Sequence, residues 1–272
     1  MDAKKTDYVL GTHDEEIARL GTQHQVWRPY MLDAWTRAGL TRGSTMVDFG
    51  AGPGYATCDA AEIVGRQGHV TAIERSPAFL DYARQQSQRR DFSWITFHSA
   101  DLIGDDLALT GFDLAWCRWV ASFVSAPATL LQRISDSLRT GGRAVFHEYQ
   151  DYSTWRVIPT SERLDSFVRG VMSSWRASGG EPNIAGPLIS MMGKVGMQVI
   201  ELRPLIFAIR PANFAWAWPA SFIVSNSHRL VELGRMTRED AGALQTEWLA
   251  LEQNPDTVMI TPLVLEIIAV KR

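Results

Sequence analysis

Short apolar runs alternate with amphipathic stretches between residues 45 and 150. The runs at 45–51, 69–75, 95–101, 112–120 and 143–149 predict strands, and the stretches at 54–65, 76–88 and 128–142 have helical spacing. Ser76 can cap the second of these helices, with Pro77 at its first position. Strands that alternate with helices at this pitch predict an α/β fold, a parallel sheet with helices on both faces.

Further elements flank this segment. Residues 8–38, 161–179 and 185–196 have helical patterns, 197–209 and 257–270 predict strands, and 211–254 is an aromatic helical stretch. The chain has no internal repeat and no low-complexity linker. We therefore expect one domain over residues 1–272, with an N-terminal helical lid (1–40), a cofactor-binding core (41–150), and the remaining strands with a helical cap (151–272).

Composition narrows the classes of partner. The chain is 46% hydrophobic with a net charge of −3, which gives no general reason to expect nucleic acid. No stretch approaches the roughly 18 apolar residues that span a bilayer, and the polar first residues lack the apolar core of a signal peptide. Cys58 and Cys117 form neither a metal-type spacing nor a disulfide framework. We expect a cytoplasmic monomer or homodimer that binds a small molecule and no metal.

The stretch "VDFGAGPG" places three glycines directly after the first strand. In an open parallel sheet, ligands bind beyond the carboxyl ends of the strands, and the following helix presents free amides there. Gly50, Gly52 and Gly54 would let a nucleotide-like ligand lie on the backbone, although a tight turn alone would also use glycine. Glu74 ends the second strand, where its carboxylate can accept both ribose hydroxyls. Asp101 follows the third strand, where it can either reach an adenine amino group or cap its own turn.

The spacing of the loop separates two cofactors. It lacks the third glycine of the dinucleotide fingerprint, and Asp48 precedes it by two residues. "VDFGAGPG" resembles motif I of the class I S-adenosylmethionine-dependent methyltransferases, and "IERSP", "SADL" with "FDLAWCRWV", and "LRTGGRAVFHEY" look like the motifs that follow it. The resemblance implies S-adenosyl-L-methionine as cofactor and a seven-stranded Rossmann-like sheet whose last strand is antiparallel. The cofactor-binding residues that it implies in the core are Asp48, Gly50, Ala51, Gly52, Gly54, Glu74, Arg75, Asp101, Leu102 and Arg118.

The N-terminal segment "YVLGTHDEEIARLGTQHQVWRP" is similar to the leading segment of the ubiquinone/menaquinone-biosynthesis-like group, in which helices fold over the cofactor. On that resemblance, Tyr8, Gln23 and Trp27 would line the methionine end of the site. Arg118 would then face the methionine carboxylate, and an ordinary surface ion pair is the alternative.

Two adjacent residues at the end of the fifth strand are the catalytic candidates. His147 or Glu148 could remove a proton from an acceptor, but neighbouring strand residues point to opposite faces, so at most one would face a pocket. The alternative is that His147 packs in the sheet and Glu148 pairs with an arginine. His13 and His24, on the expected lid, are further candidates or simply exposed.

The cap gathers Phe214, Trp216, Trp218 and Phe222. They predict either a helix that buries its aromatic face or an apolar pocket for a flat acceptor.

Methyl transfer from a sulfonium requires chiefly alignment and exclusion of water, so a general base is optional. We expect O-, N- or C-methylation of a small, apolar or aromatic organic molecule, in secondary metabolism or cofactor synthesis. The alternatives are an NAD-dependent oxidoreductase, which the loop spacing disfavours, and a protein that binds S-adenosylmethionine without turnover.

Overall fold

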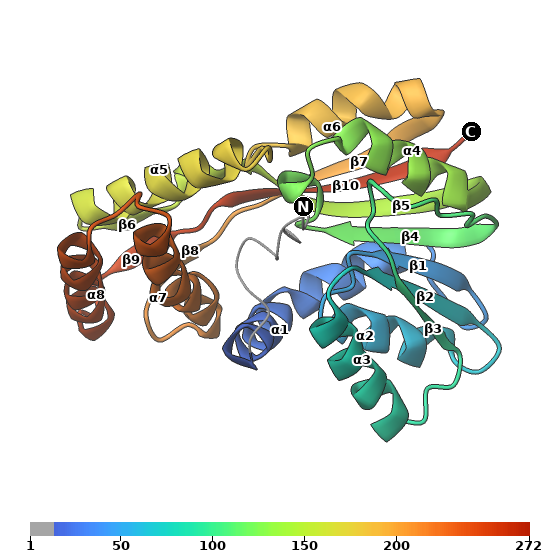
Figure 1. The fold of residues 1–272 in the computed structure, drawn as a ribbon, viewed down its shortest axis with the longest axis horizontal. Helices are drawn as coiled ribbons and strands as arrows, with labels where there is room; N and C mark the ends of the chain where they lie inside the picture. The colour runs from blue at the N-terminus through green and yellow to red at the C-terminus, as the bar shows by residue number, and fades with distance from the viewer. Residues whose placement is uncertain (1–13) are drawn as a thin grey trace, which may run out of the picture.

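The computed structural model describes residues 14–272. Seven strands form one sheet, shown edge to edge in Figure 1, in the order β3 (Ile95–Ser99), β2 (His69–Glu74), β1 (Thr45–Phe49), β4 (Phe112–Arg118), β5 (Leu138–Asp151), β10 (Leu263–Lys271) and β7 (Met197–Leu205). The pairs from β3 to β5 are parallel, and β10 is antiparallel to both of its neighbours. The predicted seven-stranded α/β sheet with an antiparallel last strand is confirmed.

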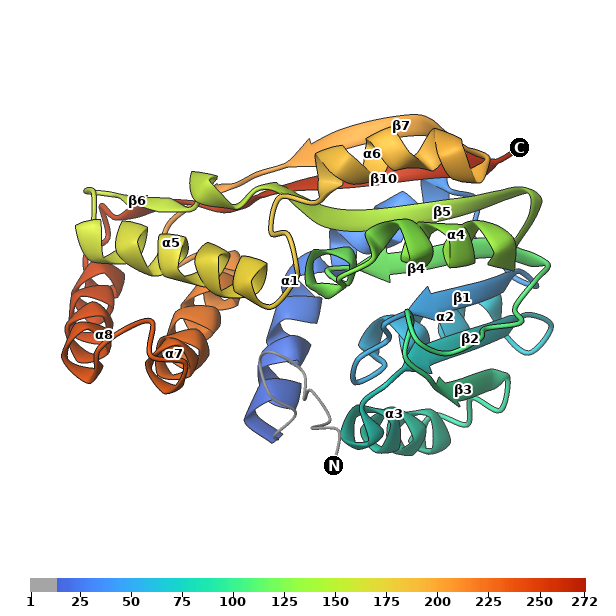
Figure 2. The same ribbon diagram turned by 45° about the horizontal axis from the view of Figure 1, so that its top comes forward.

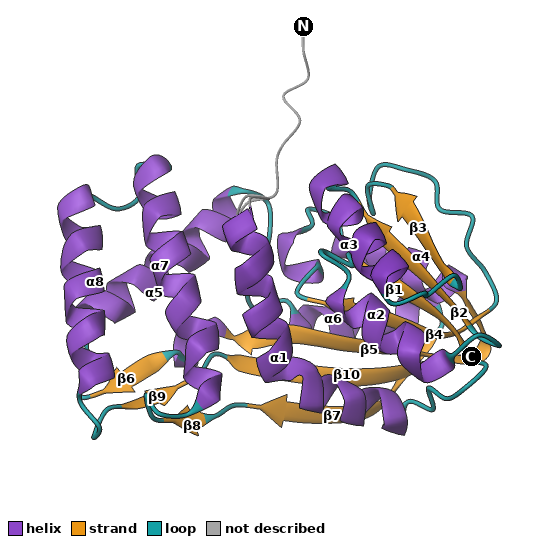
Figure 3. Ribbon diagram, turned by 90° about the horizontal axis from the view of Figure 1, so that it is seen from below, coloured by secondary structure: helices purple, strands orange, loops and turns teal. Residues whose placement is uncertain are grey.

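Helices cover both faces of the sheet because alternate strand residues point to opposite sides. On one face, Leu114 and Trp116 of β4 pack with α1 (Asp14–Arg37) and α2 (Tyr55–Val64). On the other face, Ala115 and Cys117 pack with α4 (Pro127–Ser137) and α6 (Ala185–Met192). Figure 3 shows the sheet between these helices, together with α3 (Pro77–Arg89), which the predicted Ser76 cap begins.

The C-terminal segment builds a smaller unit beyond the carboxyl ends of the parallel strands. It comprises α5 (Glu162–Ala177), α7 (Ala217–Glu232) and α8 (Arg238–Gln253) on a three-stranded sheet of β6 (Arg156–Ile158), β9 (Val258–Ile260) and β8 (Ala208–Ile209). Figure 2 shows these elements on the side to which β1 and β4 point, with α1 between them and the main sheet. We call them the cap. The sequence did not predict its sheet.

Three predicted boundaries were wrong. The helix expected over 128–142 ends at Ser137, because Leu138 already pairs with Phe112 as the start of β5. The strands expected over 197–209 and 257–270 are each divided, into β7 and β8 and into β9 and β10. Each divided strand therefore contributes to both sheets and ties the cap to the core.

Four short 3₁₀ turns complete the described elements: η1 (Ala121–Phe123), η2 (Tyr152–Thr154), η3 (Gly193–Val195) and η4 (Phe214–Trp216). No helix within residues 14–272 combines the length and the apolar character that crossing a membrane requires.

Candidate functional site

The glycine loop joins β1 to α2 at the carboxyl edge of the sheet. Gly50, Gly52 and Gly54 have φ values of 75°, 54° and 80°, which side-chain-bearing residues rarely adopt. A Cβ at Gly50 would lie 2.4 Å from Val120 Cγ2, and one at Gly54 would lie 2.6 Å from Ala83 Cβ, whereas one at Gly52 would meet nothing within 4 Å. Close packing therefore explains two of the glycines. Gly52 faces open space, and the Ala51 amide donates to Ile73 O at 2.9 Å.

Glu74 ties this loop to the end of β2. Its Oε2 accepts from the Gly52 amide at 3.0 Å, and its Oε1 accepts from the Ser76 amide at 2.8 Å. Burial raises the pKa of this carboxyl, partly offset by those amide hydrogen bonds. Each carboxylate oxygen can accept more than one hydrogen bond, so Glu74 retains acceptor capacity beside the loop.

Asp101 caps its own turn, which was one of the two roles that the sequence predicted for it. Its Oδ1 accepts from the amides of Ile103 at 2.7 Å and Gly104 at 2.9 Å, and these hydrogen bonds lower its pKa. Arg75 lies 3.9 Å from Oδ2. Leu102, which follows, is packed in the core cluster beneath α4. Contact of Asp101 or Leu102 with adenine stays a prediction.

Asp48 is buried beneath the loop rather than open beside it. Its Oδ2 accepts from the Thr57 hydroxyl at 2.7 Å, and burial raises its pKa to about 6. The residue therefore connects β1 to α2 and helps to position the glycine loop. A direct contact of Asp48 with the cofactor stays a prediction.

Arg118, at the end of β4, belongs to a chain of polar contacts with α1 and α2. Its Nη2 donates to Nδ1 of His24 at 3.3 Å, so Nε2 of His24 carries the proton and donates to Asp59 at 3.0 Å. Arg28 donates to the same carboxylate oxygen at 2.7 Å. Burial lowers the pKa of Arg118 to about 10 and keeps that of His24 below its ordinary value.

The second terminal nitrogen of Arg118, Nη1, is a buried atom. Among the described residues, nothing accepts a hydrogen bond from its buried Nη1. Unpartnered buried donors are uncommon in native proteins, and a charged one is especially costly. This atom is therefore available to an anionic ligand at the carboxyl edge.

The other predicted residues of the lid have different surroundings. Gln23 is buried and accepts from Arg19 Nη1 at 3.0 Å. Trp27 is buried with its ring 5.2 Å from that of Trp119 and 4.9 Å from that of Trp218. Tyr8 and His13 lie outside the described residues.

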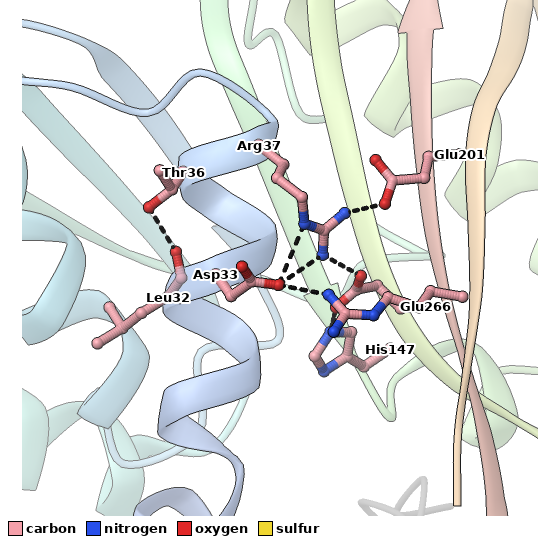
Figure 4. Close-up of polar contacts among 8 residues, drawn as sticks. Leu32, Asp33, Thr36, Arg37, His147, Glu201 and Glu266 are labelled. Atoms are coloured by element: carbon pink, nitrogen blue, oxygen red, sulfur yellow. Dashed lines mark hydrogen bonds and ion pairs between the residues drawn. The ribbon is translucent and has the colours of Figure 1, made fainter.

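His147 points to the face of the sheet covered by α1. Its Nε2 donates to Oε2 of Glu266 at 2.9 Å, and Arg37 of α1 contacts both Glu266 and Glu201. Figure 4 shows this group, in which His147 and Glu266 are buried and the exposed Asp33 adds a further carboxylate to Arg37. Burial lowers the pKa of His147, so its ring is neutral. For Glu266, burial alone would raise the pKa, but the hydrogen bonds from His147 and Arg37 lower it.

Glu148 points to the opposite face, as adjacent strand residues must. Its Oε1 accepts from the amides of Val120 and Ala121, both at 2.9 Å, and its Oε2 accepts from the Ser122 hydroxyl at 2.8 Å. Burial raises its pKa to about 7. Within residues 14–272, Glu148 does not form the pair with an arginine that one interpretation of the sequence expected. Its carboxylate instead stabilises the turn after β4. Catalysis by His147 or Glu148 stays a prediction, and neither side chain is exposed.

The four aromatic residues expected to gather in the cap do not share one environment. Trp218 and Phe222 are buried in the cap core, whereas Phe214 is 58% exposed. Trp216 stacks on Trp248 at 5.0 Å and lines, with Phe214, an open groove of about 690 Å³ between η4, α7 and α8. The helix-packing interpretation therefore accounts for Trp218 and Phe222.

Sequence reasoning missed Trp119, which lies at the centre of the carboxyl edge. Its backbone has φ 52°, its amide donates to His147 O at 3.0 Å, and its ring is stacked with those of Tyr149 and Trp218. A bulky residue in the left-handed region is strained, and such residues concentrate at functional sites. The sequence analysis placed it inside the fourth predicted strand (112–120), whereas β4 ends at Arg118, so the pattern did not indicate its turn. Asp59 and Glu266 were missed too, because their partners are distant in sequence.

Comparisons with known proteins agree with this architecture. A family model described as "Methyltransferase domain" matches residues 40–178. Aklanonic acid methyltransferase DauC from Streptomyces sp. (strain C5) is 31% identical over 104 residues, which are 38% of this chain and 47% of that protein. The chain thus spans about half the length of this curated relative.

Solved structures share the fold at low identity. Phosphoethanolamine N-methyltransferase 2 from Haemonchus contortus, in complex with S-adenosyl-L-methionine, has a TM-score of 0.57 at 17% identity and covers 92% of this chain and 56% of its own. The [4+2]-cyclase SpnF has a TM-score of 0.54 at 16% identity and covers 89% of this chain and 80% of its own. Because one of these proteins is named a cyclase, the fold by itself does not decide the reaction.

Proposed function

The chain belongs to the methyltransferase domain family, and on that premise we propose that it transfers the methyl group of S-adenosyl-L-methionine to a small organic acceptor. The observation that carries the proposal is the carboxyl edge of β1, β2 and β4. There, an open Gly52, a half-buried Glu74 and the Nη1 atom of Arg118, which has no acceptor among residues 14–272, lie at a common edge of the sheet.

These residues fit the chemical groups of the cofactor. Glu74 has acceptor capacity for two ribose hydroxyls, since its own donors are backbone amides that leave lone pairs free. Gly52 offers a backbone surface without a side chain, next to the first amides of α2. Arg118 Nη1 would hold the methionine carboxylate, which supplies the acceptor that this donor lacks.

When bound, S-adenosylmethionine supplies a methyl group that its sulfonium already activates. The protein must then position the acceptor and exclude water. Trp27, Trp119 and Trp218 form a buried aromatic wall between α1, the end of β4 and α7, which supports both tasks. Reaction at oxygen, nitrogen or carbon is compatible with this wall, and proximity is the main source of rate.

The proposal is tested by calorimetric titration with S-adenosylmethionine, S-adenosylhomocysteine and NAD. We expect micromolar binding of both sulfur ligands and none of NAD. Glu74→Ala should abolish that binding, whereas Glu62→Ala should preserve it, because Glu62 is exposed on α2 and lies 3.6 Å from Arg90. Binding of NAD without the sulfur ligands would reject the proposal. Sulfur-ligand binding with no product from a broad acceptor screen would favour a protein that binds the cofactor without turnover.

A further inference from the structure

Two buried indole N–H groups lie at the carboxyl edge of the sheet. Within the described part of the chain, nothing accepts from Nε1 of Trp27 or from Nε1 of Trp119. Trp27 is 0% exposed and Trp119 is 8% exposed, so water does not reach these atoms freely. Buried indole N–H groups usually find a partner, and an unmet donor costs about 1–3 kcal/mol. Two such donors on touching rings indicate that a ligand supplies the acceptor atoms.

An unpartnered indole is not by itself a site, and the chain provides a comparison. Trp35 Nε1 is also buried without a described partner, but its ring lies 5.4 Å from Trp116 in the core between α1, α2 and the sheet. Trp27 and Trp119 differ because their rings are 5.2 Å apart and lie at the edge where ligands of such sheets bind. The backbone strain at Trp119 is a second, independent sign of function.

A positively charged side chain lies over one of these rings. The Arg118 guanidinium lies 5.3 Å from the centre of the Trp119 ring. The nearest carboxylate along β5, Glu148, points to the other face and is occupied by three donors of the turn after β4. Indole nitrogens can only donate, and a neighbouring cation favours a negatively charged acceptor group over a cationic amine.

We propose, resting on the proposed function, that Trp27 and Trp119 bind the methyl acceptor through an anionic oxygen, and that the acceptor is an aromatic carboxylate or phenolate. One oxyanion can accept from both indoles, while the surrounding rings contact its flat body. The ring centres of Trp27 and Trp218 are 4.9 Å apart, with the rings edge to face. An acceptor enters by parting this contact between α1 and α7. A cationic amine is disfavoured because it has no acceptor to offer the same two donors.

The test uses three probes on the full chain saturated with S-adenosylhomocysteine: 2-naphthoate, 2-naphthylmethanol and 2-naphthylmethylammonium. Calorimetry should rank their affinities in that order. Trp27→Phe and Trp119→Phe keep a six-membered aromatic ring but remove the donor, so each should weaken 2-naphthoate about tenfold, the effect of one lost hydrogen bond to a charged group. Trp35→Phe is the matched control and should leave the affinity unchanged.

A second measurement reads the donors directly. In the indole ¹⁵N–¹H spectrum, the two peaks that disappear in Trp27→Phe and Trp119→Phe should move downfield as 2-naphthoate binds, and the Trp35 peak should stay in place. Equal affinity for the ammonium probe, no binding of 2-naphthoate, or unmoved Trp27 and Trp119 peaks would overturn the inference. Failure of S-adenosylhomocysteine to bind would instead reject the proposed function, and 2-naphthoate added alone would then show whether the oxyanion site persists.

Discussion

Replacing Glu148 by glutamine separates a structural role from a catalytic one. In the wild type, this buried carboxylate accepts from Val120 N, Ala121 N and the Ser122 hydroxyl. In Glu148→Gln, the amide oxygen can accept from both backbone amides, and the amide NH₂ can donate to the Ser122 oxygen, because a hydroxyl can also accept. The geometry of the turn after β4 should therefore survive.

The loss in the free energy of unfolding should be small for Glu148→Gln and large for Glu148→Ala. Glutamine exchanges charge-assisted hydrogen bonds for neutral ones but also removes a carboxylate that burial disfavours, so we expect a loss of about 1 kcal/mol in the free energy of unfolding. Glu148→Ala leaves three donors without their acceptor, and each loss destabilises the folded state by about 1–3 kcal/mol. That sum is a large part of the 5–15 kcal/mol typical of a folded domain, so Glu148→Ala should fold poorly.

The pH dependence gives a second readout of the same change. Because the pKa of Glu148 is about 7 in the folded state and 4.5 ordinarily, the folded protein binds more protons between these values, and its stability falls as pH rises through them. The variant lacks this titration. The stability difference between the wild type and Glu148→Gln should therefore narrow as pH rises from 4.5 to 7.

The assay combines urea unfolding with the formation of S-adenosylhomocysteine from S-adenosylmethionine in the presence of a fixed panel of phenols, carboxylic acids and amines. If Glu148 only braces the turn, Glu148→Gln should keep activity within about threefold, as should the exposed control Glu62→Gln. A general base contributes about 10²–10⁴-fold. Wild-type stability and cofactor affinity combined with a hundredfold loss of turnover would refute the bracing role and assign proton transfer to Glu148.

Further outcomes follow from other parts of the site. Gly52→Ala should lower the free energy of unfolding by only about 1 kcal/mol through backbone strain, yet calorimetry should show no S-adenosylhomocysteine binding. Gly50→Ala should be the less stable variant in urea, because its Cβ would lie 2.4 Å from Val120 Cγ2. Arg118→Met should weaken S-adenosylhomocysteine at least tenfold while leaving the urea midpoint unchanged or raised; wild-type affinity would remove the carboxylate contact from the proposal. Cofactor affinity should fall as pH drops below 6.5, because protonated His24 cannot accept a hydrogen bond from Arg118. The folded state should lose stability over the same range, because the pKa of His24 is lowered by folding and the unfolded chain binds the proton more readily. His24→Gln should flatten both profiles, and an unchanged slope would contradict this role.

The sequence predicted the elements that local patterns encode. Alternating apolar runs gave the strands from β1 to β5, and the Ser76 cap gave the start of α3. The glycine loop was recognisable because its three left-handed residues admit little except glycine. These features depend on neighbours a few residues apart, which a linear pattern contains.

The partners of the candidate side chains depend on the fold and could not be predicted. Glu148 contacts residues 26–28 positions away, and His147 contacts Glu266 across 119 positions. The three-residue strand β6 is too short to show a period, and β8 and β9 were predicted only as the ends of longer strands, so the cap sheet was missed. Trp119 gave no signal at all, because its left-handed backbone is set by the contacts around it and runs against its own preference.

The end of β5 acts as a support for the end of β4. The His147 carbonyl accepts from the Trp119 amide, and the Glu148 carboxylate accepts from the next three residues. Both catalytic candidates are thus engaged in positioning Trp119, and neither is exposed to an acceptor. An acceptor that already carries an anionic oxygen needs no base to release a lone pair. The burial of both catalytic candidates and the indole donors without an acceptor among residues 14–272 therefore favour the same proposed chemistry, in which this chain would contribute position and an aromatic wall that excludes water, and the acceptor would bring its own nucleophile.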